Sequence, residues 1–264
     1  MLEIKNIFKT FNPGTVNEKI ALKGVSLTLN DGDFVTVIGG NGAGKSTMLN
    51  CVAGVFPVED GQIFIDGVDV TALPEYKRAK FIGRVFQDPM MGTAATMQIE
   101  ENLALAARRG KPRTLRPGIT KAERDAYREQ LKILGLGLED RMTSKVGLLS
   151  GGQRQALTLL MATMTKPKLL LLDEHTAALD PKTAAKVLEV TQKVVEQNRL
   201  TTLMITHNMR DAITYGNRLI MMYDGKIVVD VSGEEKKKLT VEQLLNLFSQ
   251  ASGSDEADDK LLLS

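Results

Sequence analysis

The chain has 264 residues, of which 43% are hydrophobic and 25% are charged, and its formal net charge is +2. This length allows one large domain or two small lobes with a substantial core. So small a net charge implies no strong attraction to nucleic acid. Eight Phe, four Tyr and no Trp are too few for a base-stacking platform, so we expect no nucleic acid among the partners.

Cysteine usage and hydropathy indicate a cellular compartment. The single cysteine, Cys51, cannot form an internal disulfide, which is typical of a reducing environment. The first residues carry charges among their apolar positions, unlike a signal peptide. No apolar run reaches the roughly 18 residues that a membrane-spanning helix needs. These features predict a soluble, cytosolic protein that does not itself span a membrane.

The N-terminal part of the chain has the alternation and turn residues of β-structure. Residues 2–8 alternate as an edge strand would, and Asn12-Pro13-Gly14 marks a turn. A second strand is predicted over residues 21–29, and a short buried strand over 34–38, which is apolar and β-branched. Together with the hairpin described below, these strands predict a partly antiparallel sheet.

A glycine-rich stretch follows the strand at 34–38 and matches the pattern G-x-x-x-x-G-K-[ST]. A helical pattern from Ser46 to Ala53, ended by Gly54, completes the strand–turn–helix setting that this motif needs. Backbone N–H groups of such a loop cradle phosphate oxygens, and the helix N-terminus adds positive charge. Lys45 would reach the β- and γ-phosphates, and the Ser46 hydroxyl would ligate Mg²⁺. The predicted nucleotide contacts are Gly39, Asn41, Gly42, Ala43, Gly44, Lys45, Ser46 and Thr47.

The middle of the chain changes from strands to helices. A hairpin turns at Asp66-Gly67, and a strand over residues 81–86 leads to Gln87. From about 90 to 165 the pattern is helical, clearest over residues 99–107 and 121–134. We expect this segment to be an inserted helical subdomain. The basic loop at 108–118 between the two helices is either a solvated surface loop or a contact for acidic lipid headgroups or a partner.

The stretch Leu149-Ser150-Gly151-Gly152-Gln153 precedes another helical pattern. Ser150 would cap that helix, and the two glycines would leave its N–H groups open to an anion. An ordinary capped helix start is the alternative. Two phosphate-binding helix ends in one chain suggest that each serves a different nucleotide, across a dimer.

A pair of carboxylates follows the apolar strand predicted at 169–172. At the end of this strand, Asp173 can hold Mg²⁺ through water. Its neighbour Glu174 is the better candidate for polarising an attacking water. The alternative is an acidic turn after a core strand.

The C-terminal part resumes the α/β pattern. Asp180-Pro181 starts a helix, and a buried strand over residues 201–206 ends at His207. A hairpin is predicted at Asp224-Gly225 and a last helix over 241–248. The tail after residue 250 is polar and acidic, and we expect it to be mobile.

In their order and spacing, these motifs resemble those of the nucleotide-binding subunit of an ATP-binding cassette (ABC) transporter. The elements that carry the resemblance span residues 2–230 and are the phosphate loop at 39–46, Gln87, the signature at 149–153, the strand through Glu174, Ala178-Leu179-Asp180 and His207. The resemblance implies an α/β P-loop NTPase core with an antiparallel β subdomain and an inserted α-helical subdomain. The ABC ATPase domain would span 1–230, with a RecA-like core at 1–89 and 166–230 and helices at about 90–165. A C-terminal helix and acidic tail would occupy 231–264.

The resemblance also implies roles for individual residues. Phe11 would stack on adenine, a plain core phenylalanine being the alternative. Gln87 would sense Mg²⁺ and the attacking water, and Asp180 would communicate across the dimer. His207 would contact the γ-phosphate, whereas His175 departs from the family, in which proline is usual. The catalytic residues that the resemblance implies are Lys45, Gln87, Glu174 and His207. The implied metal contacts are Ser46, Gln87 and Asp173. The implied nucleotide contacts, in addition to those of the loop, are Phe11, Ser150, Gly151, Gly152, Gln153 and Asp180.

A transporter ATPase is the function that the resemblance favours. It would use ATP and Mg²⁺ as a homodimer on the cytoplasmic face of the membrane, with permease subunits docked near Gln87 and an extracytoplasmic substrate-binding protein. Residues 100–106, the basic loop after them, and residues 173–180 are similar to those of amino-acid-type importers. A soluble ABC ATPase of an assembly system, such as iron–sulfur cluster biogenesis, has the same motifs and is the alternative. A DNA-repair ATPase would need a longer coiled-coil insertion than residues 90–165 allow, and translation-type members usually carry two cassettes in one chain.

Overall fold

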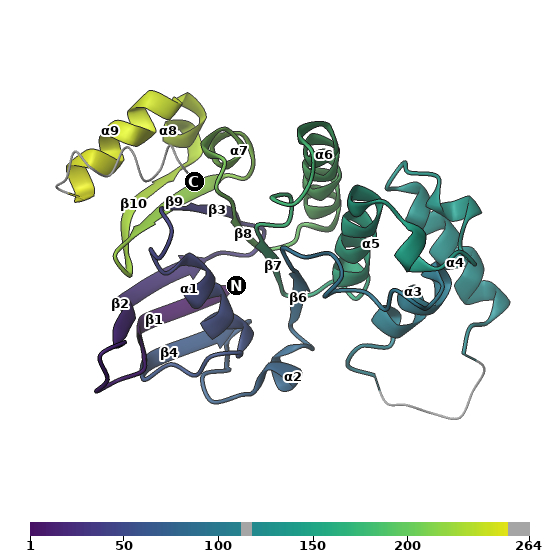
Figure 1. The fold of residues 1–264 in the computed structure, drawn as a ribbon, viewed down its shortest axis with the longest axis horizontal. Coiled ribbons are helices and arrows are strands. Elements are labelled where there is room, and N and C mark those ends of the chain that lie inside the picture. The colour runs from purple at the N-terminus through teal and green to yellow at the C-terminus, as the bar shows by residue number, and fades with distance from the viewer. Residues whose placement is uncertain (112–117, 253–264) are drawn as a thin grey trace.

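The structure is a computed structural model that describes residues 1–111 and 118–252, with side chains described as far as residue 250. Two sheets meet around one buried helix, and further helices cover the outer face of the larger sheet (Figure 1). The smaller sheet is antiparallel, in the order β2-β1-β4-β5. The larger has the order β10-β9-β3-β8-β7-β6 and is parallel except for β10.

The strands are β1 (Leu2–Phe11), β2 (Lys19–Leu29), β3 (Phe34–Ile38), β4 (Asp60–Ile65), β5 (Val68–Asp69), β6 (Ile82–Val85), β7 (Leu169–Asp173), β8 (Thr202–Ile205), β9 (Arg218–Tyr223) and β10 (Lys226–Ser232). The α-helices are α1 (Lys45–Ala53), α2 (Glu75–Arg78), α3 (Ile99–Ala107), α4 (Lys121–Lys132), α5 (Gly151–Thr163), α6 (Pro181–Asn198), α7 (Met209–Thr214), α8 (Gly233–Lys238) and α9 (Val241–Ser252). Two short 3₁₀ helices, η1 (Leu138–Asp140) and η2 (Val146–Leu148), precede α5.

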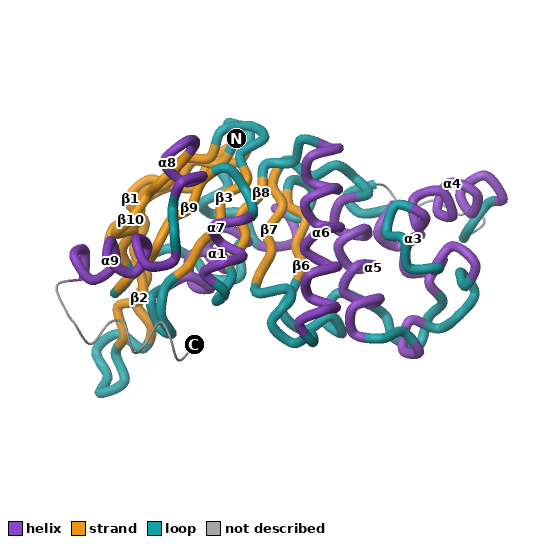
Figure 2. Tube along the Cα trace, turned by 90° about the horizontal axis from the view of Figure 1, so that it is seen from above, coloured by secondary structure: helices purple, strands orange, loops and turns teal. Residues whose placement is uncertain are grey.

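The central parallel strands are apolar at consecutive positions because helices or the second sheet cover both of their faces. Successive side chains of a strand point to opposite faces. Leu169 and Leu171 of β7 accordingly join the core around α1, whereas Leu170 and Leu172 join the core beneath α5 and α6. Figure 2 shows α5 and α6 side by side along the outer face of β6 and β7. The larger sheet therefore separates two hydrophobic cores.

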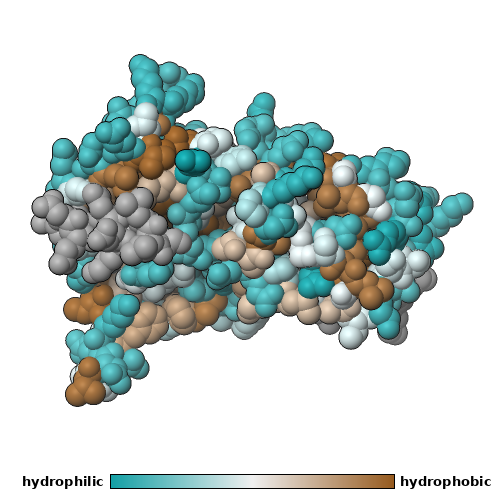
Figure 3. Space-filling model, turned by 45° about the horizontal axis from the view of Figure 1, so that its top comes forward, coloured by the Kyte–Doolittle hydropathy of each residue, from teal (hydrophilic) through white to brown (hydrophobic). Residues whose placement is uncertain are grey.

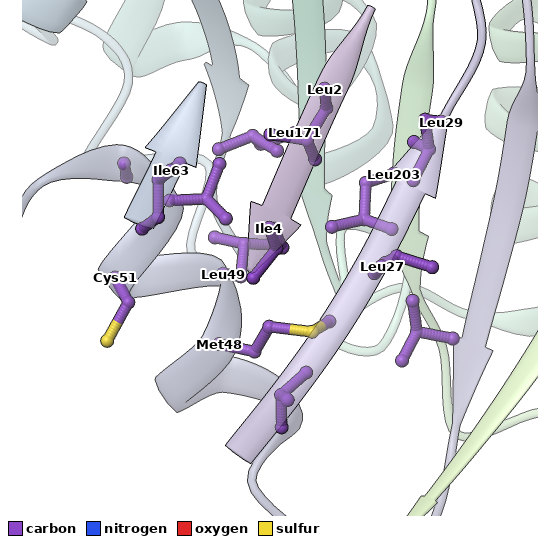
Figure 4. Packing of buried hydrophobic residues seen from close by; sticks show 14 of the residues in the cluster. Leu2, Ile4, Leu27, Leu29, Met48, Leu49, Cys51, Ile63, Leu171 and Leu203 are labelled. Atoms are coloured by element: carbon purple, nitrogen blue, oxygen red, sulfur yellow. The ribbon is translucent and has the colours of Figure 1, made fainter. Parts of the chain in front are cut away.

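Helix α1 is held between the two sheets. Its Met48 and Leu49 side chains lie among Ile4 of β1, Leu27 of β2 and Leu203 of β8, and all of them are buried (Figure 4). Full burial of a side chain of this size stabilises a fold by about 1.5–3 kcal/mol. This packing fixes the direction of α1 and with it the glycine-rich loop at its N-terminus.

Most of the predicted elements are confirmed, several to the residue. The strand at 34–38 and the helix at 99–107 have the predicted bounds. Both predicted hairpins turn with two consecutive positive φ angles, at Asp66-Gly67 and at Asp224-Gly225, which is the backbone of a type I′ turn. Helices α2, α7 and α8 were not predicted, because four to six residues are too few to show a helical period.

The prediction that residues 2–8 form an edge strand is wrong. Strand β1 pairs with β2 on one side and with β4 on the other. Alternation reports that one face of a strand is buried, as Leu2, Ile4 and Ile7 are here, but it does not report how many neighbours the strand has. The position of β1 in the sheet had to come from the structure.

Helices α3, α4 and α5 gather at one end of the molecule (Figures 1 and 2). Their apolar side chains, among them Leu103 and Leu131, belong to the same core as Leu170 of β7. Helix α9 packs at the other end through Leu244 and Phe248, in a cluster with strands β9 and β10. The predicted subdivision at 90–165, and the boundary at 230, stay predictions. The expected mobile tail and residues 112–117 of the basic loop lie outside the described residues.

The surface is mainly hydrophilic on the face that Figure 3 shows, with separate hydrophobic patches between charged regions. Within residues 1–111 and 118–252, we find no helix with the length and apolar character that crossing a membrane requires.

Candidate active site

The glycine-rich loop between β3 and α1 is shaped by backbone contacts that leave no room for side chains. Gly39 has φ +147°, and a Cβ there would lie 2.2 Å from the carbonyl oxygen of Met222. Gly44 has φ +102°, and its Cβ would lie 2.7 Å from the carbonyl oxygen of Ala21. Only glycine fits both the conformation and the space at these two positions.

The N-terminus of α1 is open. No side chain caps it, and its first turn contains no acidic residue, whereas side chains of Thr120, Ser150 and Asp180 cap α4, α5 and α6. The first N–H groups of a helix have no partner within the helix and attract anions. The start of α1 is therefore suited to a phosphate group.

Lys45 is 5% exposed. Its Nζ donates to the carbonyl oxygens of Gly39, at 2.6 Å, and Gly40, at 3.1 Å. Burial lowers the pKa of Lys45, while the carboxylates of Glu174 and Asp173 act in the opposite direction. The carbonyl groups of the loop thus hold the Lys45 ammonium group, and Lys45 also lines a cavity.

The cavity over the loop has a volume of about 220 Å³. The residues that line it come from the β1–β2 hairpin, the loop and the ends of β7 and β8, and they are Phe11, Lys19, Ala21, Asn41, Gly42, Ala43, Gly44, Lys45, Ser46, Thr47, Glu174 and His207. All of these except Lys19 and Ala21 were predicted as site residues. The pairing of Phe11 with Lys19 across the hairpin is the signal that identifies Lys19.

Glu174 and His207 form the central polar pair of this cavity. The Oε2 atom of Glu174 lies 2.7 Å from Nε2 of His207, and the side chains are 11% and 24% exposed. The hydrogen bond from His207 is the main cause that lowers the pKa of Glu174, and partial burial opposes it. Nδ1 of His207 is buried and has no hydrogen-bond partner in the described part of the chain. The carboxylate is therefore ionised and oriented by the imidazole.

The backbone at Glu174 is unusual. Its φ is +47°, in the left-handed region, which costs a residue other than glycine about 1–3 kcal/mol. Two hydrogen bonds support this conformation: the Glu174 N–H donates to Ile205 O at 3.1 Å, and the Ala177 N–H donates to Glu174 O at 3.0 Å. In this conformation the Glu174 side chain lines the cavity over the phosphate loop.

Asp173 and Gln87 lie outside the cavity lining. An oxygen of Asp173 is 3.5 Å from an Arg84 guanidinium nitrogen, which also donates to Asn50 at 2.7 Å. Burial raises the pKa of Asp173, and the Arg84 charge opposes this shift. Gln87 follows β6 and is exposed. Their predicted metal roles stay predictions.

Ser150 caps α5 as predicted. Its hydroxyl accepts from the Gln153 N–H at 3.3 Å, while the Gln153 side chain accepts from the Ser150 N–H at 3.1 Å. Ser150 and Gly151 are exposed, but Gly152 is buried, and a Cβ there would lie 2.0 Å from the Thr183 methyl group. Close packing of α5 against the start of α6, and not only access to an anion, therefore requires glycine at 152.

The signature stretch and Asp180 lie outside the lining of the phosphate-loop cavity. None of Ser150, Gly151, Gly152, Gln153 or Asp180 lines it. Figure 1 places α5 beyond β6, on the far side from α1, and the perpendicular view of Figure 2 agrees. Within one chain, the two predicted phosphate-binding helix ends do not meet.

His175, next to the predicted base, faces the other way. It is 2% exposed, and its Nε2 lies 3.1 Å from the Thr191 hydroxyl on α6. That hydroxyl donates to Val187 O at 2.8 Å, so Nε2 of His175 carries a proton and donates to it. Burial lowers the pKa of His175 to about 4, and the side chain is a neutral part of the core.

Comparison with known proteins identifies this arrangement. A family model described as ABC transporter matches residues 22–177. The chain is 45% identical over 256 residues to a tyrosine transport ATP-binding protein of Clostridioides difficile, covering 95% of this chain and all of that protein. Over 248 residues it is 34% identical to the spermidine/putrescine import ATP-binding protein PotA of Haemophilus ducreyi, covering 94% of this chain and 61% of that protein.

A solved structure agrees with the sequence relatives. The dimeric structure of an ATP-binding cassette in a post-hydrolysis state, bound to ADP and Pi, is 31% identical and has a TM-score of 0.74. The match covers 88% of this chain and 98% of that one. The predicted fold class and ATPase activity are confirmed. The chain belongs to the ABC transporter family, as an ATP-binding subunit that hydrolyses ATP.

Proposed function

We propose that this subunit hydrolyses ATP between two copies of the chain, at the cytoplasmic face of the membrane, and so drives the import of an amino-acid-type solute through separate permease subunits. The observation that carries the catalytic part is the Glu174–His207 pair, 2.7 Å apart in the cavity that the phosphate loop lines. The name of the Clostridioides difficile relative, which covers this chain almost end to end, supports the class of solute. An extracytoplasmic substrate-binding protein is a further partner in the same proposal.

The hydrolysis step needs a base, a phosphate cradle and a cation. The N–H groups at the start of α1 and the Lys45 ammonium bind the β- and γ-phosphates. Glu174, ionised and oriented by His207, accepts a proton from the water that attacks the γ-phosphorus. The new P–O bond forms to this water oxygen, and the bond from the γ-phosphorus to the β–γ bridging oxygen breaks, leaving ADP and phosphate.

Mg²⁺ fits the oxygen donors that the chain offers. We propose Ser46, Asp173 and Gln87 as its hydroxyl, carboxylate and amide contacts, because Mg²⁺ prefers oxygen and keeps several waters. In the described ranges, no three or more His, Cys, Asp or Glu residues gather into a group that could hold a metal ion. Bound there, it would neutralise charge on the phosphate oxygens.

The second copy of the chain supplies what the first lacks. The cavity of about 220 Å³ is smaller than the roughly 300–1,000 Å³ typical of small-molecule clefts and cavities. The Ser150 end of α5 is exposed, has no acidic residue in its first turn, and does not line this cavity. We propose that Ser150 of one copy covers the nucleotide bound by the loop of the other, with Asp180 at the same interface.

A groove between α2, β6, α3 and α5 is the proposed permease dock. Its volume is about 800 Å³, and its lining includes Tyr76, Met91 and Leu105, which are 74%, 69% and 56% exposed. Arg108 and Arg109 also line it. Exposed apolar side chains next to basic ones suit an amphipathic helix that carries acidic residues, and we assign the groove to a helix of the permease. Phe86, adjacent to Gln87, lines this groove and links it to the end of β6.

Glu174→Gln tests the catalytic assignment. We expect ATP turnover to fall by about 10²-fold or more, the usual contribution of a positioned base, with ATP binding retained. Glu189→Gln is a matched control, since Glu189 is an exposed residue of α6 that pairs with Lys186. Near-normal turnover by Glu174→Gln would show that another group activates the water.

Co-purification tests the transport assignment separately. We expect the chain to be recovered with an integral membrane protein. A variant that combines Tyr76→Asp and Leu105→Asp should lose this association. Recovery with a soluble scaffold instead would support an ATPase of an assembly system such as iron–sulfur cluster biogenesis.

A further inference from the structure

We propose that Lys19 is a second phosphate-binding cation of this site, one that contacts the phosphate chain of the nucleotide from the β1–β2 hairpin. The inference rests on the proposed function, in which the phosphate-loop cavity binds ATP. It adds a residue outside the phosphate loop and outside every motif recognised in the sequence.

Strand pairing places Lys19 beside Phe11. Lys19 is directly opposite Phe11 in the antiparallel register of β1 and β2, and opposite residues of such a pair project from the same face of a sheet. Both side chains line the phosphate-loop cavity. The Lys19 ammonium also reaches the loop itself, since a Cβ built on Gly42 would lie 3.2 Å from its Nζ. Lys19 therefore starts opposite Phe11 on β2 and brings its ammonium group next to the phosphate loop.

The charges around the cavity leave a role for this cation. Among the described lining residues, Lys19 and Lys45 carry the two fixed positive charges, and Glu174 carries a negative one. Two of the three donors of Lys45 are already bonded to carbonyl oxygens of its own loop. A triphosphate brings several negative charges, more than one ammonium group can neutralise.

Lys19 itself is available. Its side chain is exposed, and it forms no hydrogen bond or ion pair with any residue that the structure describes. The adjacent carboxylate, Glu18, accepts a hydrogen bond from the Gly14 N–H at 2.6 Å and so is used within the hairpin turn. All three N–H donors of Lys19 are thus free to meet phosphate oxygens.

The test compares nucleotides that share a base and differ in phosphates. Affinities of Lys19→Gln for adenosine, ADP and ATP would be measured by competition against a fluorescent nucleotide at low and high salt. We expect ADP and ATP to bind about tenfold more weakly at low salt, in line with a charge-assisted contact, and the loss to shrink as salt screens the charge. Adenosine affinity stays unchanged, and KM for ATP rises while kcat does not fall.

Lys23→Gln is the matched control. It removes the same charge from the same strand, but Lys23 pairs with Asp224 and does not line the cavity, so its nucleotide affinities should equal those of the wild type. Unchanged ADP and ATP affinity in Lys19→Gln, or an equal loss for adenosine, would overturn the proposal. Phe11→Ala separates the two assignments, because it should weaken adenosine and ADP alike. If Phe11→Ala leaves the affinity for adenosine unchanged, the contact between Phe11 and the base is wrong. The comparison of adenosine, ADP and ATP then still decides the proposal for Lys19.

Discussion

Gly152 offers a direct test of how the signature stretch is built. In Gly152→Ala the new methyl group would lie 2.0 Å from the Thr183 methyl carbon at the start of α6. Non-bonded carbon atoms pack at about 3.5–4.0 Å, so one helix must move by about 1.5 Å or Thr183 must leave its rotamer. Either change disturbs the junction that carries both Ser150 and Asp180, the caps of α5 and α6.

The size of the effect follows from two opposing contributions. Overpacking of a well-packed contact costs about 1–3 kcal/mol. Alanine regains at most about 1 kcal/mol of helix propensity over glycine. A contact of 2.0 Å belongs at the severe end of the overpacking range, about 2–3 kcal/mol. The net loss is therefore about 1–2 kcal/mol, which for a chain of this size lowers Tm by about 2–8 °C, at 2–4 °C per kcal/mol.

Thermal unfolding of a four-variant cycle is the assay. Thr183→Ser removes the clashing methyl carbon and keeps the backbone N–H that Asp180 caps, so it should restore most of the Tm that Gly152→Ala loses. The expected coupling between the two changes is about 1–2 kcal/mol. A Gly152→Ala variant as stable as the wild type, or one that Thr183→Ser does not rescue, would refute the packing explanation.

Three further predictions concern buried charged or titratable groups. Arg78 is 2% exposed and donates to four backbone carbonyl oxygens, two of them in the last turn of α1. Arg78→Met should therefore lower the free energy of unfolding in urea by about 3 kcal/mol. A loss below about 1 kcal/mol would contradict this. The pKa of His175 falls from 6.5 to about 4 on folding, so between these pH values the unfolded chain binds the proton and the wild type loses stability as pH falls. Between pH 6.5 and 4, the free energy of unfolding of His175→Asn should fall by about 3 kcal/mol less than that of the wild type. Identical pH profiles of stability for the two proteins would exclude a buried neutral imidazole. Lys45→Ala should abolish both ATP turnover and ATP-driven dimerisation, and a variant that dimerises at the ATP concentration that suffices for the wild type would count against the shared site.

The parts of the site that could be predicted from the sequence are those formed by residues that lie close together in the chain. The loop at 39–47 could be predicted because its glycines, Lys45 and Ser46 act from one short segment between a strand and a helix. Ser150 could be predicted as a cap because its partner, Gln153, is three residues away.

Features that depend on contacts between distant segments were not found. Glu174 and His207 were both named, but their hydrogen bond depends on β7 and β8 being neighbours and on the left-handed backbone at Glu174. Nothing in the sequence distinguishes Lys19 from other exposed lysines, and only the register of β1 and β2 places it opposite Phe11. The steric demand at Gly152 comes from Thr183, which belongs to a different helix.

The central claim is that one chain holds the nucleotide and another completes its site. Light scattering of the Glu174→Gln variant in ATP, with and without Ser150→Arg, tests it most directly when ATP binding to the monomer is measured in parallel. The shared site predicts that Glu174→Gln forms an ATP-dependent dimer, and that adding Ser150→Arg abolishes the dimer while the monomer still binds ATP. Dimerisation unaffected by Ser150→Arg, or a monomer that loses its ATP affinity through that substitution, would contradict the account.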